Sequence, residues 1–317
     1  MTFPSLTPLF VDASRAKCER PPGDSHRGRV RDTLEPGPLP LASEQSSGRC
    51  ETAAVHPDLE LAFRLADIAD AITVGLWSPS GVASTAKADD SPVTAADVAA
   101  EHAMRVHVAG SCPDDGFLGE EIGEVGGTNG RRWIVDGIDG TRFFAAGQAT
   151  WGTLIALECD GAIVLGLSSS PLQHRRWWAS RGGGAFTGWA TDVSAAARLH
   201  VSEVRTGRSA RVATLPSFER MTTMQQRIIE RCCGAAPSDR PWSHQNGVAE
   251  GELDACVWFG GDIWDHAAPS IIVEEAGGRF TDHRGGTRLD TRTAIYSNGL
   301  VHDEILAAVA AGRKVER

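Results

Sequence analysis

The feature that most constrains the fold is a short apolar run that ends in two closely spaced carboxylates. The run RRWIV, residues 131–135, is apolar and β-branched, which is typical of a buried strand. It is followed at once by the segment Asp136-Gly137-Ile138-Asp139-Gly140-Thr141. The sequence therefore predicts a buried strand whose C-terminal end carries two carboxylates.

The spacing of these two carboxylates suits a bound cation. Asp136 and Asp139, with a glycine between them, can turn their oxygens toward one point while the backbone stays accessible. Magnesium takes oxygen ligands at octahedral angles and keeps positions open for water and substrate. The amides of Gly140 and Thr141, if they open a helix, would also donate to a phosphate. A plain acidic turn after a strand explains this segment alone equally well.

The rest of the chain alternates helices with strands joined by hairpins. Asp160-Gly161, between TLIALE and IVLGL, favours a two-stranded hairpin, and RRWWASRGGGAF (175–186) predicts a strand closed by a glycine-rich loop. Helices are expected from Thr94 to Val108 and from His266 to Ala276, with Pro269 near the start of the latter. A further amphipathic helix is indicated by apolar residues at steps of three and four: Leu61, Leu65, Ile68, Ile72 and Leu76. This mixture predicts a layered α/β architecture with largely antiparallel sheets.

The N-terminal region differs from the rest in composition. Residues 1–55 are rich in Pro, Gly, Ser, Arg and Glu and show no sustained hydrophobic period. They cannot bury enough apolar surface to order themselves, so we expect a disordered extension or a mis-assigned start. The folded domain is expected over 56–317, divisible into subdomains 56–195 and 196–317.

Charge and cysteine content limit the partners and the compartment. The formal net charge is −10, from 41 acidic and 31 basic residues, which favours neither nucleic acid nor an anionic membrane as a partner. Seven cysteines, an odd number without paired spacing, indicate free thiols in a reducing compartment. Signal-peptide and membrane-helix patterns are not found. We therefore expect a cytoplasmic protein.

Three further acids stand out at the ends of apolar segments. Glu120 and Glu121 follow Gly119, and Asp265 follows Trp264 just before a predicted helix. Taken separately, paired glutamates are typical of a solvated helix or loop face, and an aspartate before a helix is typical of an N-cap.

Taken together, these acids belong to four linked motifs that resemble the inositol monophosphatase superfamily over roughly residues 60–312. The motifs are K-x-D-x-S-P-V-T-x-A-D (Lys87 to Asp97), G-E-E (Gly119 to Glu121), W-x-x-D-x-I-D-G-T (Trp133 to Thr141) and W-D-x-A-A followed by E-A-G-G (Trp264 to Gly278). The resemblance implies an α/β (α+β) fold, a layered αβαβα sandwich of the sugar-phosphatase type with largely antiparallel sheets.

The resemblance also implies a reaction, magnesium-dependent hydrolysis of a small phosphate monoester. Several cations suit this reaction because an anionic ester repels its nucleophile. Asp97 and Thr141 would orient the attacking water and help to deprotonate it, together with Glu120, and Asp139, Gly140 and Thr141 would contact substrate. Homodimer formation and inhibition by lithium are implied as well. Two or three Mg²⁺ ions would be ligated by Glu120, Asp136, the Ile138 carbonyl, Asp139 and Asp265.

Within the superfamily the chain looks most similar to the histidinol-phosphate phosphatases. The cues are DGFLGEE (115–121), WGTLIALE (151–158), RRWWASRGGGAF (175–186) and NGLVHDEIL (298–306). Three positions depart from the family pattern: Gly137 replaces a proline, Phe143 an asparagine, and Trp258 a glutamate that grips the substrate. Trp258 could cover a ring of the leaving group. Asp262 either supplies the missing charge or is a plain loop aspartate.

Several alternatives stay open at this point. The ester could instead be an inositol, sugar or cyclitol phosphate, or adenosine 3',5'-bisphosphate, and Phe143 and Gly137 also allow a non-catalytic binding protein on the same scaffold. A thiol–imidazole set of Cys112, His102 and His107 is the nucleophilic alternative. Gly182-Gly183-Gly184 lacks the Lys-Ser/Thr ending of a P-loop and is interpreted as a tight turn.

Overall fold

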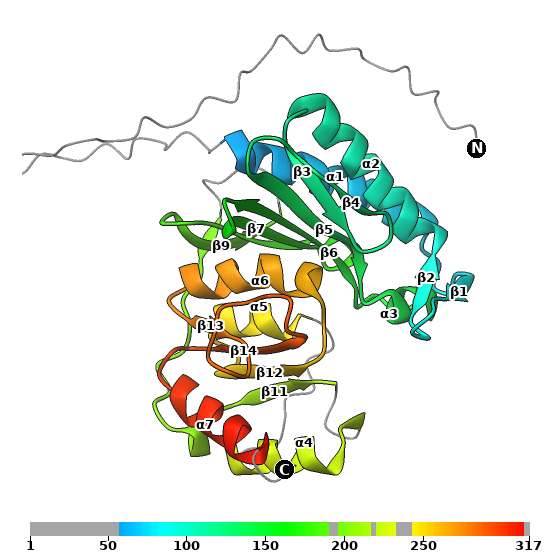
Figure 1. The fold of residues 1–317 in the computed structure, drawn as a ribbon. Coiled ribbons are helices and arrows are strands. Elements are labelled where there is room, and N and C mark those ends of the chain that lie inside the picture. Colours follow the sequence, from blue (N-terminus) through cyan, green and yellow to red (C-terminus); the bar gives the residue numbers. More distant parts are fainter. Residues whose placement is uncertain (1–56, 190–195, 217–219, 233–242, 314–317) are drawn as a thin grey trace, which may run out of the picture. The chain divides into compact units, whose positions relative to one another are not determined.

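The computed structural model describes residues 57–189, 196–216, 220–232 and 243–313 (Figure 1). The expected N-terminal extension, residues 1–55, lies outside the described residues. Among the helices that are described, none combines the length and the apolar content needed to cross a membrane.

The first half of the domain is built on an eight-stranded sheet. Its strand order is β10-β9-β8-β7-β6-β5-β3-β4, and every described pair is antiparallel except β3 with β5. Asp160 (φ 49°) and Gly161 (φ 82°) close the predicted β6–β7 hairpin in the left-handed conformation that Asp-Gly favours. The strands are β3 (Gly116–Gly119), β4 (Gly123–Val125), β5 (Arg131–Asp139), β6 (Gly152–Cys159), β7 (Ala162–Ser170), β8 (Arg175–Ser180), β9 (Gly184–Gly188) and β10 (Ala197–Arg198).

Two helices, α1 (Pro57–Leu76) and α2 (Ala95–Ser111), cover one face of this sheet (Figure 1). Their apolar sides pack on Trp133 and Trp178, and Phe63 meets the Trp178 ring edge-on with centroids 5.1 Å apart. The predicted stripe on α1 is only partly buried, because Leu76 is 48% exposed. Leu61 and Leu65 of the stripe are buried, together with small residues that let the helix approach its neighbours closely: Ala62, Ala66 and Ala69.

A four-stranded sheet forms the second half of the domain, in the order β11-β12-β14-β13. Helices α5 (His244–Ala249) and α6 (Ile263–Glu275) lie between the two sheets, and α4 (Thr223–Cys232) and α7 (His302–Arg313) cover the outer face (Figure 1). The strands are β11 (Val212–Leu215), β12 (Ala255–Phe259), β13 (Arg279–Thr281) and β14 (Thr293–Ser297).

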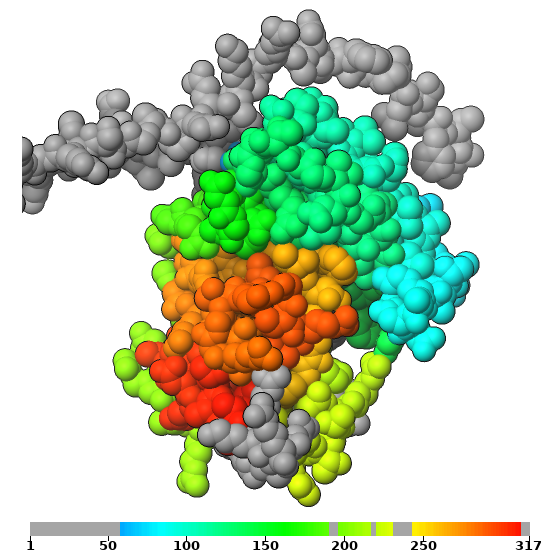
Figure 2. Space-filling model, in the orientation of Figure 1, coloured from blue at the N-terminus to red at the C-terminus, as the bar shows by residue number. Residues whose placement is uncertain are grey.

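One continuous core joins the layers. Leu154 of β6, Ile271 of α6 and Tyr296 of β14 belong to the same buried cluster. On the face shown in Figure 2, the orange residues of the second half lie directly against the green residues of the first. The layers therefore follow the order αβαβα, which confirms the expected fold class.

Helix α6 differs in one respect from the prediction. It begins at Ile263, three residues earlier than expected, with Asp262 as its N-cap, so Pro269 lies inside the helix rather than near its start. The earlier start follows from the capping interactions of Asp262 and Asp265, which satisfy N–H groups of the first turn. The proline removes only the hydrogen bond to the carbonyl four residues before it.

The far end of α6 explains the glycine-rich turn. The Glu275 carboxylate accepts N–H bonds from Gly182 (2.8 Å) and Gly184 (2.9 Å). Because this protein carboxylate occupies the amides, Gly182-Gly183-Gly184 acts as a β8–β9 turn and not as a phosphate cradle.

Smaller elements connect the layers near one end of the large sheet. Strands β1 (Ser84–Ala86) and β2 (Pro92–Thr94) form a separate hairpin, and α3 (Thr141–Ala145) follows β5 directly. Two short 3₁₀ turns, η1 (Pro171–Gln173) and η3 (Gly207–Ser209), complete the described elements.

Candidate active site and metal centre

The C-terminal end of β5 presents its acids through a break in strand register. Asp136 pairs with Leu154 and Asp139 with Gly152, so the two residues between the aspartates bulge out of the ladder. The Ile138 N–H donates to Asp136 Oδ1 (2.9 Å), and the Thr153 hydroxyl donates to the Gly137 carbonyl (2.9 Å). These bonds hold the loop that the sequence predicted to be acidic.

The N-terminal turn of α6 brings a third carboxylate to the same place. One carboxylate oxygen each of Asp136, Asp139 and Asp265 lie within 4.8 Å of one another. Asp265 is also held from its own helix, because its Oδ2 accepts the Asp262 N–H at 2.6 Å. Acids that are far apart in the sequence therefore meet where β5 ends against α6.

Glu120 stands beside this group at the end of β3. Its Oε1 lies 2.6 Å from Lys87 Nζ, and the same ammonium group lies 2.7 Å from Glu121 Oε1. Lys87 thus neutralises part of the negative charge that the sequence places here. Burial raises the pKa of Glu120 to about 6, the charges of Glu121 and Asp139 add to this, and Lys87 opposes it.

The electrostatics of the cluster fit a divalent cation. Burial raises the pKa of Asp136 and of Asp265 well above the usual value, and the neighbouring carboxylates raise both further. Carboxylates that repel one another in a buried place are stabilised by positive charge between them. The donors are all oxygens, which hard cations such as Mg²⁺ prefer. The residues present therefore suit the magnesium that the sequence resemblance implies.

A hydroxyl–carboxylate pair lies next to the acidic cluster. The Thr141 hydroxyl is 2.9 Å from Asp97 Oδ1 and 3.0 Å from the Ile138 carbonyl oxygen. The other carboxylate oxygen of Asp97 accepts the N–H (2.9 Å) and the hydroxyl (2.5 Å) of Thr94. Burial raises the pKa of Asp97, and the bonds from Thr94 and Thr141 oppose that rise. Thr94 is the N-cap of α2, where the predicted helix was expected to start, so the cap also fixes Asp97.

One buried acid of this region was missed by the sequence analysis. Glu101 is fully buried on α2 and accepts N–H bonds from the segments that follow Glu120 and Asp136. Burial raises its pKa to about 7, against those bonds. The available signal was its spacing, since Glu101 lies four residues after Asp97 and therefore on the same face of α2.

The end of β12 and the loop after it lie beside the N-terminal turn of α6. Trp258 is partly buried against the core, and its ring meets the His266 ring edge-on with centroids 4.8 Å apart. His266 Nε2 is 3.1 Å from the Gly260 carbonyl, so that nitrogen carries the proton, and Tyr296 donates to Nδ1 at 2.8 Å. Burial lowers the pKa of His266 to about 4. Asp262 caps α6, and its carboxylate lies 3.5 Å from Arg292 Nη1.

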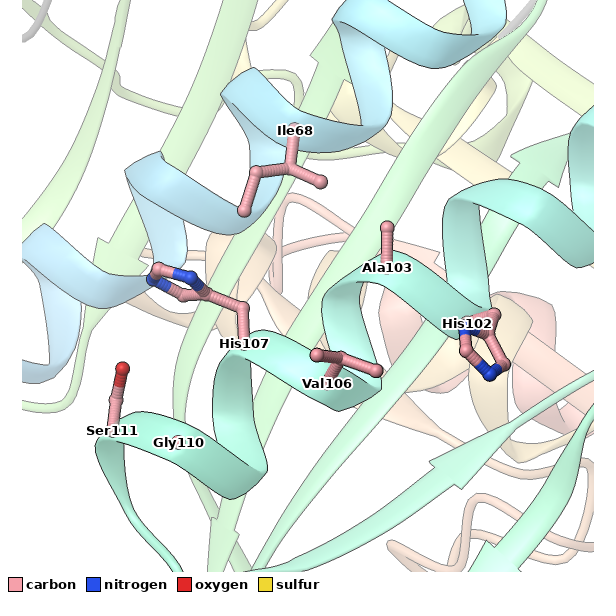
Figure 3. A pocket seen from close by; sticks show the side chains of 7 residues that line it. All are labelled: Ile68, His102, Ala103, Val106, His107, Gly110 and Ser111. Atoms are coloured by element: carbon pink, nitrogen blue, oxygen red, sulfur yellow. The ribbon is translucent and has the colours of Figure 1, made fainter. Parts of the chain in front are cut away.

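A shallow groove between α1 and α2 has no part in this site. Its lining includes Ile68, His102 and His107, and none of the acids named above (Figure 3). The ring of His107 points toward α1, whereas His102 lies on another turn and points away from it (Figure 3). Cys112 does not line the groove and is the C-cap of α2. The structure therefore does not assemble the thiol–imidazole set.

The fold and the acidic site together define the class of protein. An all-oxygen cluster of carboxylates with a hydroxyl–carboxylate pair beside it provides the groups that metal-assisted attack of water on an anionic ester requires. The chain is a metal-dependent phosphatase, a phosphoric monoester hydrolase.

Comparison with known proteins gives the family. The model of the inositol monophosphatase family matches residues 55–314, and the chain belongs to that family. It is 42% identical to the histidinol-phosphatase of Streptomyces coelicolor over 258 residues, 78% of this chain and 95% of the relative. For the histidinol-phosphatase of Mycobacterium tuberculosis the identity is 39% over 266 residues, 81% and 99% of the two chains.

A solved structure gives the same fold. The extragenic suppressor protein suhB from Bartonella henselae matches with a TM-score of 0.69 at 27% identity, covering 80% of this chain and 98% of that one. The expected family resemblance and the expected enzyme class are confirmed.

Proposed function

We propose that this protein is a histidinol-phosphate phosphatase that uses two or three Mg²⁺ ions. The observation that carries the reaction class is the approach of Asp136, Asp139 and Asp265 within 4.8 Å beside the Asp97–Thr141 pair. The substrate is supported by the two histidinol-phosphatases that match this chain at 42% and 39% identity over nearly their whole lengths.

The metal ligands follow from the donor set. The carboxylates of Asp136, Asp139 and Asp265 would ligate the Mg²⁺ ions, with Glu120 and the Ile138 carbonyl as further ligands. When bound, the ions lower the pKa of water and neutralise the phosphate and the leaving oxygen. Lys87 adds a positive charge at the same edge through its contacts with Glu120 and Glu121.

The Asp97–Thr141 pair would handle the proton of the attacking water. When the Thr141 hydroxyl donates to Asp97, the lone pairs of its oxygen face outward and can accept a proton. That acceptance passes the hydroxyl proton on to Asp97, whose raised pKa favours receiving it. The amides of Gly140 and Thr141, together with Asp139, would contact the phosphate.

Trp258 and Asp262 would recognise the leaving group. Histidinol offers an aromatic imidazole and an ammonium group, which suit an indole face and a carboxylate. Asp262 has exposed side-chain surface and already lies 3.5 Å from a cationic group, that of Arg292. A substrate ammonium would therefore meet a carboxylate that accepts cationic partners.

We further propose that the protein is cytoplasmic and forms a homodimer. Light scattering of the purified protein would test the dimer.

Phosphate release from a panel of esters tests this proposal. The panel contains histidinol phosphate, inositol 1-phosphate, fructose 1,6-bisphosphate and adenosine 3',5'-bisphosphate, each with Mg²⁺ and with EDTA. We expect Mg²⁺-dependent release that is fastest on histidinol phosphate and is inhibited by lithium. If another ester is hydrolysed fastest, that ester replaces histidinol phosphate as the proposed substrate. If no ester releases phosphate, a non-catalytic binding protein is favoured.

A further inference from the structure

A single buried carboxylate joins the two backbone segments that carry acids of the metal centre. Glu101 is fully buried on α2. Its Oε2 accepts the N–H groups of Glu121 (2.9 Å) and Ile122 (3.1 Å), and its Oε1 accepts the Gly137 N–H (3.4 Å). Glu121 follows Glu120 directly, and Gly137 follows Asp136, so each bond lies beside a proposed ligand.

Both segments are pressed closely onto this carboxylate. A Cβ atom at Gly119 would lie 2.3 Å from Glu101 Oε2, and one at Gly137 would lie 3.1 Å from Glu101 Cγ and 2.9 Å from the Asp97 carbonyl. Any side chain at Gly119 would therefore displace the Glu101 carboxylate. Glycine at 137 also keeps the N–H that a proline there would lack.

The two segments come from different strands, and α2 is their common support. Glu120 directly follows β3 and Asp136 lies in the C-terminal half of β5, and these strands run parallel beside each other. Asp97, four residues before Glu101 on the same face of α2, contacts Thr141. One face of α2 thus contacts the Glu120 segment and the Asp136 segment through Glu101, and the Thr141 hydroxyl through Asp97.

We propose that Glu101 is a positioning residue that sets the separation of Glu120 and Asp136 and so determines metal affinity. This inference rests on the proposed metal site. A carboxylate can serve donors on both of its oxygens, whereas the amide of glutamine has only one accepting oxygen. Glu101→Gln therefore keeps the volume of the side chain but must place an NH₂ group against one of the two segments.

Binding of Mn²⁺ to purified protein, followed by electron paramagnetic resonance, measures the effect without turnover. We expect the Mn²⁺ dissociation constant of Glu101→Gln to rise at least about tenfold, as is usual when a residue that holds metal ligands is changed. Gly119→Ala should raise it similarly, because the methyl group displaces the same carboxylate. The double variant should be no worse than the more affected single variant, since both act on one contact.

Asp254→Asn is the matched control. Asp254 is also a fully buried acid that accepts a backbone N–H, from Arg211 at 2.6 Å, but it precedes β12 at the end opposite the Trp258–Asp262 loop. We expect this variant to lower the melting temperature at least as much as Glu101→Gln while leaving Mn²⁺ affinity within about twofold.

The outcomes separate the two proposals. If the wild-type protein binds Mn²⁺ and Glu101→Gln binds it equally well, the role of Glu101 alone is overturned. Wild-type protein that binds no Mn²⁺ would overturn both that role and the proposed function. If Glu101→Gln does not fold, Gly119→Ala alone decides, and unchanged affinity in that folded variant overturns the inference.

Discussion

The two sides of the candidate site are held in different ways. On the metal side, backbone N–H groups fix two of the acids, the Ile138 N–H on Asp136 and the Asp262 N–H on Asp265, and Lys87 holds Glu120. On the leaving-group side, Trp258 packs against His266, and Asp262 shares a longer, exposed contact with Arg292. The metal side keeps every carboxylate of the motifs, although Gly137 and Phe143 depart from the pattern beside them, whereas on the leaving-group side the departure at Trp258 replaces a carboxylate.

This difference separates two properties of the enzyme. Carboxylates that are buried and locked by backbone N–H groups can hold cations in one geometry, which fixes the reaction class. Trp258, near the end of β12, and Asp262, in the loop after it, can change without disturbing that geometry, so substrate preference can vary within one family. Changes on the metal side should therefore lower the turnover of every ester. Changes on the leaving-group side should alter only the relative rates on different esters.

The largest effect is expected for Asp136→Asn. This variant removes one of the three clustered carboxylates while keeping its volume, so kcat/KM should fall at least about a thousandfold, or about 4 kcal/mol, on every substrate. Phosphate release is the measurement, and circular dichroism should show an intact fold. Asp303→Asn is the control, because the Asp303 side chain is 85% exposed on α7. Near-normal turnover of Asp136→Asn would remove Asp136 from the metal centre.

A smaller loss is expected for Thr141→Ala. The alanine cannot donate to Asp97 or accept a proton from water, so kcat should fall about a hundredfold, the lower range for a residue of this kind. Thr141→Ser keeps the hydroxyl and should retain most of the activity. If the serine and alanine variants were equally impaired, the methyl group rather than the hydroxyl would be the important part of Thr141.

Trp258→Glu tests the other side of the comparison. It restores the carboxylate that relatives carry there, so the ratio of kcat/KM between histidinol phosphate and inositol 1-phosphate should change about tenfold, while the rate on an aryl phosphate changes less. Trp189→Glu, on the first half of the domain, is the matched control. An equal change on all substrates would place Trp258 outside the specificity pocket.

The sequence predicted elements whose signals are local. The Asp160-Gly161 hairpin and the helix that starts near Thr94 each depend on a few neighbouring residues, and both are found. The predicted α1 stripe is buried at Leu61 and Leu65 and exposed at Leu76, because periodicity cannot show where along the helix the contact with the core ends. Pro269 was misplaced because the capping contacts of Asp262 and Asp265 depend on side-chain geometry.

The site could be foreseen only in part, for a similar reason. Motif spacing pointed to Asp136, Asp139 and Asp265, which the structure brings together. The spacing of Glu101 from Asp97 places both on one face of α2, but it could not show that N–H groups of two distant segments meet the Glu101 carboxylate. Motif spacing also could not show that Arg292 lies beside Asp262, because that contact joins two loops.

The last prediction concerns folding stability and the contribution that the metal side makes to it. In metal-free protein the pKa values of Glu120, Asp136 and Asp265 are raised, so the folded state binds more protons than the unfolded state above the ordinary carboxylate range. Folding stability should therefore fall as the pH rises from about 4.5 through 6, the raised pKa of Glu120, and further while the aspartates lose their protons.

Magnesium should cancel this loss, because it neutralises the same carboxylates and competes with their protons. At a hundredfold excess over its dissociation constant, Mg²⁺ adds about 2.7 kcal/mol, or roughly 5–10 °C in melting temperature, at pH 7.5. The increment should shrink at pH 5 and vanish in Asp136→Asn, yet persist in Trp258→Glu, as differential scanning calorimetry can show. An increment that is equal at both pH values would mean that the cation does not bind to these acids, and the contrast between the two sides would lose its electrostatic basis.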